Sequence, residues 1–314
     1  MKIQSIASFL RPEREVESTW DIFTGRTSHG FKRLPSINVV VKLIFANAIL
    51  AFAVVPVLWV ISAAFDTSNT INNATLLPRH LSMKNFHLLL SNPDAPYLKW
   101  MTNSIVISVS TTIIVCTLSA FSAYSFSRFR YRGQRFFSTT ILIFQLFPNI
   151  LAIVALYLIL SSIGEIIPFF GLNSLGGLIL IYSSAGLGFN MWIMKGYFDT
   201  IPMELDEAAR IDGASNIQIF FQIFLPLAKP VIYTVGMLSF IATYGDFFLP
   251  RVMLNNSDNF TLAIGLTKLV VGQYTTQWGI FAAGALLGCI PVVIIFGLLQ
   301  KNIVSGATLG AVKF

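Results

Sequence analysis

Residues 195–229 contain acidic and small residues at spacings that suit contact with another molecule. Three acids lie close together: Glu204, Asp206 and Glu207. Acids in a first helical turn suit the positive end of the helix dipole. We therefore predict a helix that begins near Pro202 and ends at Gly213 in a left-handed cap. Leu205, Ala208 and Ala209 share one face of that helix. A face made of such small side chains allows a second protein to approach closely. These residues therefore suit a docking surface better than a catalytic site.

A second short helix is predicted directly after this cap. Ser215 and Gln218 have the spacing of a capping box at a helix start. An apolar stripe follows, made of Ile219, Phe220, Ile223 and Phe224. Pro226 is expected to stop this helix, because proline lacks the backbone N–H that the next turn needs. From the pattern alone, the two helices could dock on a protein or lie in the lipid interface, and both interpretations stay open.

Catalytic and metal-binding patterns are missing from the sequence. It contains no P-loop, H-E-x-x-H, CxxC or nucleophile-elbow motif. Cys116 and Cys289 lie in apolar stretches and suit packing better than a disulfide. Glu165 and Asp246, two acids near apolar segments, are expected to be solvated or paired with arginine. We predict that the chain has no catalytic residue and no metal site, and that it is not an enzyme. The alternative is an ion-coupled carrier acting alone, which would need buried titratable residues and internal repeats.

The elements that must position these residues are membrane helices. The 314 residues are 55% hydrophobic and 11% charged, whereas soluble domains carry about 25% charged residues. The net charge of +7 does not indicate a nucleic-acid partner, because no soluble domain is large enough to display a basic face. A span needs about 20 mostly apolar residues. Six segments are predicted to cross a bilayer: Val39–Phe65, Asn103–Phe126, Phe136–Leu160, Ser174–Met194, Pro230–Leu249 and Gly279–Leu299.

The positions of the basic residues predict how the chain is oriented. Fifteen lysines and arginines fall in tails and loops on one side of the six spans, and five fall on the other. Basic residues mark the cytoplasmic side, so both termini and residues 195–229 are expected in the cytoplasm. The predicted organisation is a cytoplasmic tail at 1–38, a six-helix transmembrane domain at 39–300 and a cytoplasmic tail at 301–314.

The loop at 195–229 resembles the EAA loop of ABC importer permeases. The matching positions are Glu207-Ala208-Ala209, Gly213, Ile223 and Leu225-Pro226, at the family's spacing. The resemblance implies a type I importer permease fold, in which residues 202–213 form a coupling helix that docks on a separate ATP-binding subunit. The implied coupling residues are Glu207, Ala208, Ala209, Asp212, Gly213, Ile223, Leu225 and Pro226.

Further segments resemble the smaller permease subunit of the maltose/maltodextrin type, the MalG type. They are residues 143–148, 155–157, 164–169, 171–173, 195–198 and 260–265. The resemblance covers about residues 40–314 and leaves the first tail without a recognised motif. It implies a permease of a binding-protein-dependent sugar importer in the bacterial inner membrane. In that family, sugar contacts come mostly from the companion permease.

The resemblance also implies the partners of this chain. They are a second permease in a heterodimer, a dimer of ATP-binding subunits, an extracytoplasmic sugar-binding protein and the lipid bilayer. ATP and Mg²⁺ would be used by the ATP-binding partner and no cofactor would be bound by this chain. The C-terminal tail, expected to be flexible alone, would contact the ATPase through Gly306, Gly310 and Lys313. The polar turn Asn255, Asn256, Ser257 and Asp258 would contact the sugar-binding protein.

Overall fold

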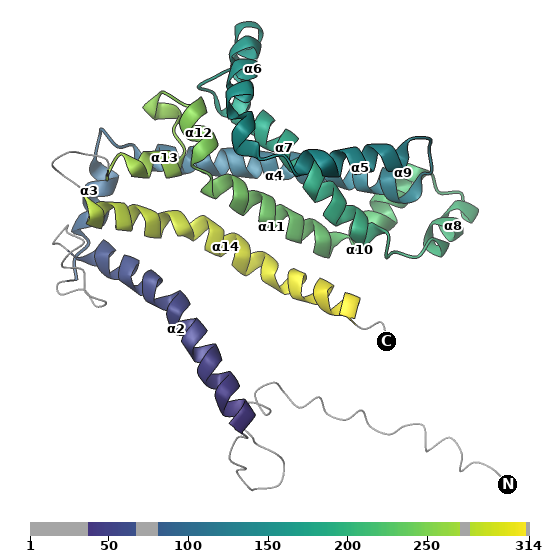
Figure 1. The fold of residues 1–314 in the computed structure, drawn as a ribbon, viewed down its shortest axis with the longest axis horizontal. Coiled ribbons are helices and arrows are strands. Elements are labelled where there is room, and N and C mark those ends of the chain that lie inside the picture. The colour runs from purple at the N-terminus through teal and green to yellow at the C-terminus, as the bar shows by residue number, and fades with distance from the viewer. Residues whose placement is uncertain (1–36, 67–80, 271–276, 312–314) are drawn as a thin grey trace. The chain divides into compact units, whose positions relative to one another are not determined.

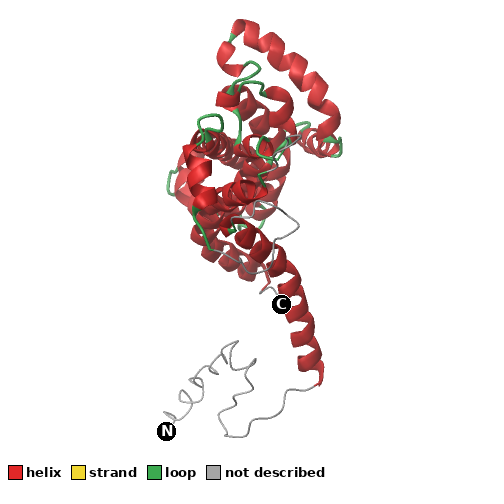
Figure 2. Cartoon of the chain, turned by 90° about the vertical axis from the view of Figure 1, so that its left-hand side faces the viewer, coloured by secondary structure: helices red, strands yellow, loops and turns green. Residues whose placement is uncertain are grey.

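The computed structural model describes residues 37–66, 81–270 and 277–311, and in these residues every regular element is helical (Figures 1 and 2). The α-helices are α2 (Ile37–Phe65), α3 (Lys84–Ser91), α4 (Tyr97–Arg128), α5 (Gln134–Gln145), α6 (Ile153–Ile166), α7 (Leu175–Phe198), α8 (Glu204–Ile211), α9 (Asn216–Ile219), α10 (Leu225–Leu227), α11 (Lys229–Gly245), α12 (Phe248–Met253), α13 (Leu262–Thr267) and α14 (Trp278–Ala311). The short η elements are η2 (Asn149–Ala152), η3 (Pro168–Phe170), η4 (Phe220–Phe224, a π-helical turn) and η5 (Ser257–Asn259). The all-α prediction is confirmed.

Four of these helices, α2, α4, α7 and α14, are long and apolar enough to cross a membrane. Two bent pairs bring the number to six if each pair counts as one span. The first pair joins α5 to the segment Ile150–Ile166 at an angle of 85°. The second joins Asn216–Leu227 to α11 at 75°. The described chain thus contains four to six candidate spans, and six is the predicted number.

Two predicted spans have different boundaries in the structure. The predicted helix Phe136–Leu160 is broken, because α5 ends at Gln145 and Pro148 adopts an extended conformation before η2. The predicted helix Pro230–Leu249 ends early, at Gly245, because Asp246 is extended and its carboxylate accepts a hydrogen bond from the Phe248 N–H. At 17 residues, α11 is about 26 Å long.

The chain divides into two compact units, 1–58 and 59–314. In the second unit, α4, α7 and α11 lie alongside one another and α14 packs against α11 (Figure 1). Small residues allow these close approaches. Gly288 of α14 faces Leu262, which would lie 2.7 Å from an added Cβ, and Gly284 accepts a 2.8 Å hydrogen bond from the Tyr97 hydroxyl. Gly284 and Gly288, one turn apart on α14, therefore allow α14 to approach its neighbours closely.

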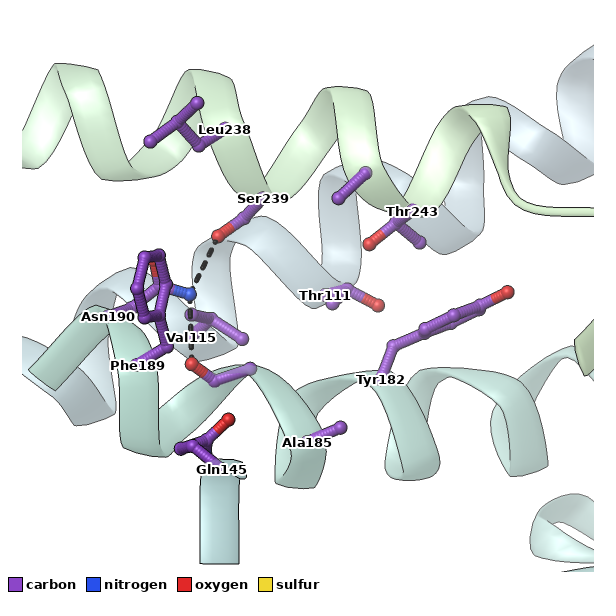
Figure 3. A pocket seen from close by; sticks show the side chains of 12 residues that line it. Thr111, Val115, Gln145, Tyr182, Ala185, Phe189, Asn190, Leu238, Ser239 and Thr243 are labelled. Carbon is purple, nitrogen blue, oxygen red and sulfur yellow. Dashed lines mark hydrogen bonds between the residues drawn. The ribbon is translucent and has the colours of Figure 1, made fainter. Parts of the chain in front are cut away.

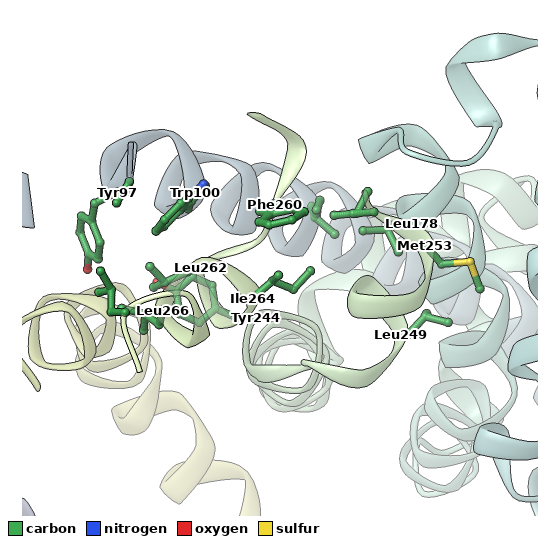
Figure 4. Close-up of a cluster of buried hydrophobic side chains, with 14 of the residues drawn as sticks. Tyr97, Trp100, Leu178, Tyr244, Leu249, Met253, Phe260, Leu262, Ile264 and Leu266 are labelled. Atoms are coloured by element: carbon green, nitrogen blue, oxygen red, sulfur yellow. The ribbon is translucent and has the colours of Figure 1, made fainter. Parts of the chain in front are cut away.

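Two buried apolar clusters hold this unit together. The first joins the start of α4 and α7 to the end of α11, α12 and α13, and it contains Tyr97, Trp100, Leu178, Tyr244, Met253 and Ile264 (Figure 4). The second joins the other ends of α4, α7 and α11 to α9, η4 and α10, and it contains Tyr124, Met194, Phe198, Ile219, Phe224 and Val231. Each of α4, α7 and α11 therefore takes part in a buried apolar cluster near both of its ends.

Replacing Gly265 with alanine tests the packing of the first cluster. A Cβ at this position would overlap the indole of Trp100, which is fully buried and donates a 2.9 Å hydrogen bond to the Ser257 carbonyl. Overpacking of this kind typically costs about 1–3 kcal/mol. We expect a lower thermal unfolding midpoint for detergent-purified Gly265→Ala. Gly245→Ala is the control, because an added Cβ there meets nothing within 4 Å. Equal midpoints for the two variants would contradict the packing described here.

Candidate functional site

The predicted docking helix is present as α8, Glu204–Ile211, with all three acids in its first turn. Gly213 has φ +84° and ends the helix in the left-handed conformation expected of it. The Ala214 N–H then donates to the Ala209 carbonyl over 2.9 Å, which closes the last turn. The helix begins two residues later than predicted, after Pro202 and Met203.

The outward face of α8 combines acidic and apolar side chains. Glu207, Ala208, Asp212 and Gly213 are exposed, and so are Leu205 and Ile211. Ala209 is half-buried because it packs against the second apolar cluster. One side of this short helix is thus fixed to the rest of the protein, and the other side is free to meet a partner.

The segment after α8 begins as predicted and ends differently. The Ser215 hydroxyl accepts from the Gln218 N–H, and the Gln218 side chain accepts from the Ser215 N–H over 2.8 Å, so the capping box is confirmed. Pro226 does not stop the helix, because it occupies the first turn of α10, where a missing N–H is tolerated. The chain bends at Ala228 instead. Ile223 and Leu225 are half-buried and Pro226 is exposed.

A buried ion pair, which sequence reasoning missed, fixes α8 to the end of α4. The Arg128 Nε lies 2.7 Å from the Asp206 Oδ2, and their side chains are only 3% and 5% exposed. Arg128 also donates a 2.6 Å hydrogen bond to the Ile201 carbonyl and lies 4.5 Å from the centre of the Phe224 ring. Removing one partner from such a pair leaves an uncompensated buried charge. The pair therefore determines where the docking helix lies.

The loop Asn255–Asp258, which is predicted to contact the sugar-binding protein, is held in place by hydrogen bonds to one asparagine. Asn173 has φ 57° and its side-chain carbonyl accepts from the N–H groups of Asn255 and Asn256, over 3.1 and 2.9 Å. A short polar side chain tolerates this left-handed conformation. The two asparagines are exposed beside Ser257 and Asp258. The loop thus presents polar groups on a fixed backbone.

The same loop is tied to the start of α4. The Asp258 carboxylate pairs with Lys99 over 3.0 Å, and the Asp258 carbonyl accepts from Asn103 over 2.8 Å. Arg128, at the other end of α4, holds α8. About 29 residues of unbroken helix separate Lys99 from Arg128, which is about 43 Å at 1.5 Å per residue. A bilayer core is about 30 Å thick, so the loop and the docking helix lie at opposite ends of a helix long enough to cross it.

The expected flexible tail is helical for most of its length. The backbone of α14 continues to Ala311 and includes Gly306 and Gly310. The glycines of this tail do not end the helix, because small residues such as these do not prevent a helix that is already nucleated from continuing. Lys313 lies outside the described residues.

A cavity of about 470 Å³ lies between α4, α7, α11 and the end of α5. Its lining includes Thr111, Gln145, Tyr182, Asn190, Ser239 and Thr243 (Figure 3). The Asn190 amide donates to the Gly186 carbonyl over 2.8 Å and to the Ser239 hydroxyl over 3.2 Å. Thr111, Asn190 and Ser239 lie between the parts of α4, α7 and α11 that form the two apolar clusters, whereas Tyr182 and Thr243 lie within the part that forms the first cluster. The cavity thus brings uncharged polar groups together with apolar ones inside the helix bundle.

The acids near the membrane differ in their surroundings. Glu165 is exposed, as predicted. Asp246 is half-buried and accepts a 2.7 Å hydrogen bond from the Tyr182 hydroxyl, and the described ion pairs include none between Asp246 and an arginine. Among the described residues, no group of three or more histidines, cysteines and acids could hold a metal ion.

These features agree with known transport proteins. The family described as the inner membrane component of binding-protein-dependent transport systems matches residues 115–307. The chain belongs to this family. Membership identifies it as a transport subunit and an inner membrane component, and not as an enzyme. It also decides between the candidate classes in favour of a permease subunit over a carrier acting alone.

Individual relatives extend the similarity over most of the chain. The galactooligosaccharides transport system permease protein GanQ of Bacillus subtilis (strain 168) is 40% identical over 278 residues, which are 87% of this chain and 96% of GanQ. The maltose/maltodextrin transport system permease protein MalG of Vibrio vulnificus (strain YJ016) is 37% identical over 277 residues, which are 85% of this chain and 93% of MalG. The resemblance to sugar permeases is therefore confirmed.

A solved structure confirms the fold of the permease family. A bacterial ABC transporter involved in the import of the acidic polysaccharide alginate superposes with a TM-score of 0.72 at 22% sequence identity. The match covers 86% of this chain and 99% of that chain. At this identity the likeness shows the fold alone, which is that of an ABC importer permease.

Proposed function

We propose that this permease imports a neutral oligosaccharide of the maltodextrin or galactooligosaccharide class, driven by ATP hydrolysis on a separate subunit. The substrate class rests on the relatives named above. The ATPase would dock on α8 and the sugar-binding protein on the loop at Asn255–Asp258. A companion permease would complete the pathway. Both termini and α8 would lie in the cytoplasm, as the distribution of basic residues predicts.

One observation carries this proposal. The helix α4 contacts the α8 docking helix at Arg128 and the polar loop at Lys99, about 43 Å apart. Binding of a loaded receptor at one end and closure of the ATPase at the other would each favour one position of the same helix. A ligand shifts such an equilibrium only through its different affinity for the two states. The residues for coupling are those of the EAA loop, with the tail residues Gly306, Gly310 and Lys313 as further ATPase contacts.

Reconstitution of the transporter tests the proposal. The purified chain alone in liposomes should show neither ATP hydrolysis nor sugar uptake. Co-expression with its companion permease, the ATP-binding subunit and the sugar-binding protein should produce ATP-dependent uptake of radiolabelled maltotriose or a galactotriose. Uptake by the isolated chain driven by a proton or sodium gradient would contradict it. So would an assembled complex that hydrolyses ATP without importing either sugar.

A further inference from the structure

The polar cavity between the two apolar clusters contains a hydroxyl group with no partner. Thr111 of α4 is 1% exposed and lines the cavity, and its Oγ1 makes no hydrogen bond in the described part of the chain. Figure 3 shows its side chain between α11, which carries Ser239 and Thr243, and α7, which carries Asn190. Burying a hydroxyl without a partner is costly, so this group is free to bond to a molecule that enters the cavity.

Several other hydroxyls in the same helices bond to their own backbone, whereas Ser108, Thr112 and Ser183 are, like Thr111, buried without a described partner. Thr102 on α4 donates to the carbonyl four residues earlier over 2.8 Å, Ser184 on α7 does so over 2.8 Å and Thr234 on α11 over 2.9 Å. A hydrogen bond from the side-chain hydroxyl to the backbone carbonyl one turn earlier is the usual arrangement for serine and threonine inside a helix. Among the described buried side chains without a partner, Thr111 is the one that lines this cavity, where it lies with amide and hydroxyl groups from other helices.

The chemistry of the lining defines the ligand class. The described residues around this cavity include hydroxyls, two amides, Tyr182 and Phe189, and none of them carries a charge. The volume of about 470 Å³ falls within the range of about 300–1,000 Å³ typical of small-molecule sites. Neutral donors and acceptors next to aromatic faces suit a polyhydroxylated, uncharged ligand. They do not suit a cation or a carboxylate, which would need a charged partner.

We propose that this subunit itself contacts the sugar in transit, with Thr111, Asn190, Ser239 and Thr243 as hydrogen-bonding partners. The proposal deepens the proposed function and rests on it. It assigns to this chain a sugar-contacting site that is separate from any site on a companion permease. Asn190 and Ser239 already bond to each other over 3.2 Å, so they hold their positions before the sugar arrives.

Neighbouring threonines provide a matched test. Thr111→Val removes the cavity hydroxyl and keeps the branched shape of the side chain. Thr112→Val makes the same change one residue along α4, where the Oγ1 is also buried without a partner but does not line the cavity. In the reconstituted complex, initial uptake of maltotriose or galactotriose should fall about three- to tenfold for Thr111→Val, as expected for the loss of one hydrogen bond. It should stay within about twofold of the parent for Thr112→Val.

Three further measurements separate a sugar contact from a packing defect. Thr111→Ser, which keeps the hydroxyl, should restore most of the uptake. The concentration of sugar-loaded binding protein that gives half-maximal uptake should not change, because delivery occurs at the outer loop. Immunoblotting should show equal amounts of each variant in the membrane.

Parental uptake by Thr111→Val would overturn the assignment, as would an equal loss in Thr112→Val or no rescue by serine. If the unmodified complex imports neither sugar, the proposed function itself is refuted and the sugar site falls with it. A functional parent with an unimpaired Thr111→Val refutes only the site.

Discussion

Asp206→Asn is expected to lower the free energy of unfolding by about 3–5 kcal/mol, the cost of leaving one member of a buried ion pair alone. The Arg128 Nε lies 2.7 Å from the Asp206 carboxylate, and both side chains are almost fully buried. Water therefore cannot solvate the guanidinium that the substitution leaves unpaired. The same change should reduce uptake strongly, because α8 loses its link to α4. Denaturant unfolding and uptake by the reconstituted complex measure the two effects.

An exposed ion pair provides the control for Asp206→Asn. Lys99 and Asp258 lie 3.0 Å apart with side chains 51% and 60% exposed. Exposed pairs contribute only about 0–1 kcal/mol, so Lys99→Gln should unfold near the parental denaturant concentration. Replacing both buried partners, as in Arg128→Met with Asp206→Leu, should recover stability relative to Asp206→Asn, because no unpaired charge remains. If Asp206→Asn proves as stable as Lys99→Gln, Arg128 and Asp206 do not fix the docking helix.

Glu207→Lys is expected to abolish uptake while the protein still inserts in the membrane at the parental level. Glu207 is exposed in the first turn of α8, and no described hydrogen bond or ion pair of its side chain would be lost. Reversing the charge at a protein interface costs several kcal/mol through like-charge contact. Binding-protein-stimulated ATP hydrolysis and co-purification with the ATP-binding subunit should both fall.

Gly213→Lys should give the same loss of uptake for a different reason. An added Cβ at Gly213 meets nothing within 4 Å, but φ +84° is unfavourable for any residue with a side chain and the bulk would project into the docking surface. Glu165→Lys is the matched charge reversal away from α8, at an exposed acid, and should transport normally. Full transport by Glu207→Lys would defeat the assignment of α8 as the coupling helix.

Local patterns in the sequence predicted local structure well. The left-handed cap at Gly213 and the capping box at Ser215 were both foreseen, because each depends on residues within four positions of one another. The ends of the spans were harder to place. Asp246 ends α11 by accepting from the Phe248 N–H, a turn that hydrophobicity does not reveal. Pro226 was misjudged because the π-helical turn at Phe220–Phe224 changes the bonding ahead of it, where the Leu225 N–H bonds to the Phe220 carbonyl.

Contacts between distant residues could not be predicted from one sequence. Arg128 was counted as a cytoplasmic charge, which stays a prediction, and Asp206 as an acid of a first helical turn, which the structure confirms. Nothing in their spacing indicates that they meet, because they are 78 positions apart and lie on different helices. The same holds for the cavity, whose polar residues come from α4, α7 and α11. Each helix alone shows only a few hydroxyls in an apolar stretch.

The unbroken course of α4 limits how the protein can move. Its 32 residues contain neither proline nor glycine, the residues at which helices most often kink. The helix must therefore act as a strut of fixed length, which can tilt or slide but cannot shorten or fold. We expect changes in shape at the interruptions between α5 and α6 and at Ala228, where the chain turns by 85° and 75°. During alternating access, α4 would then tilt as a rigid helix while the chain bends at these two interruptions.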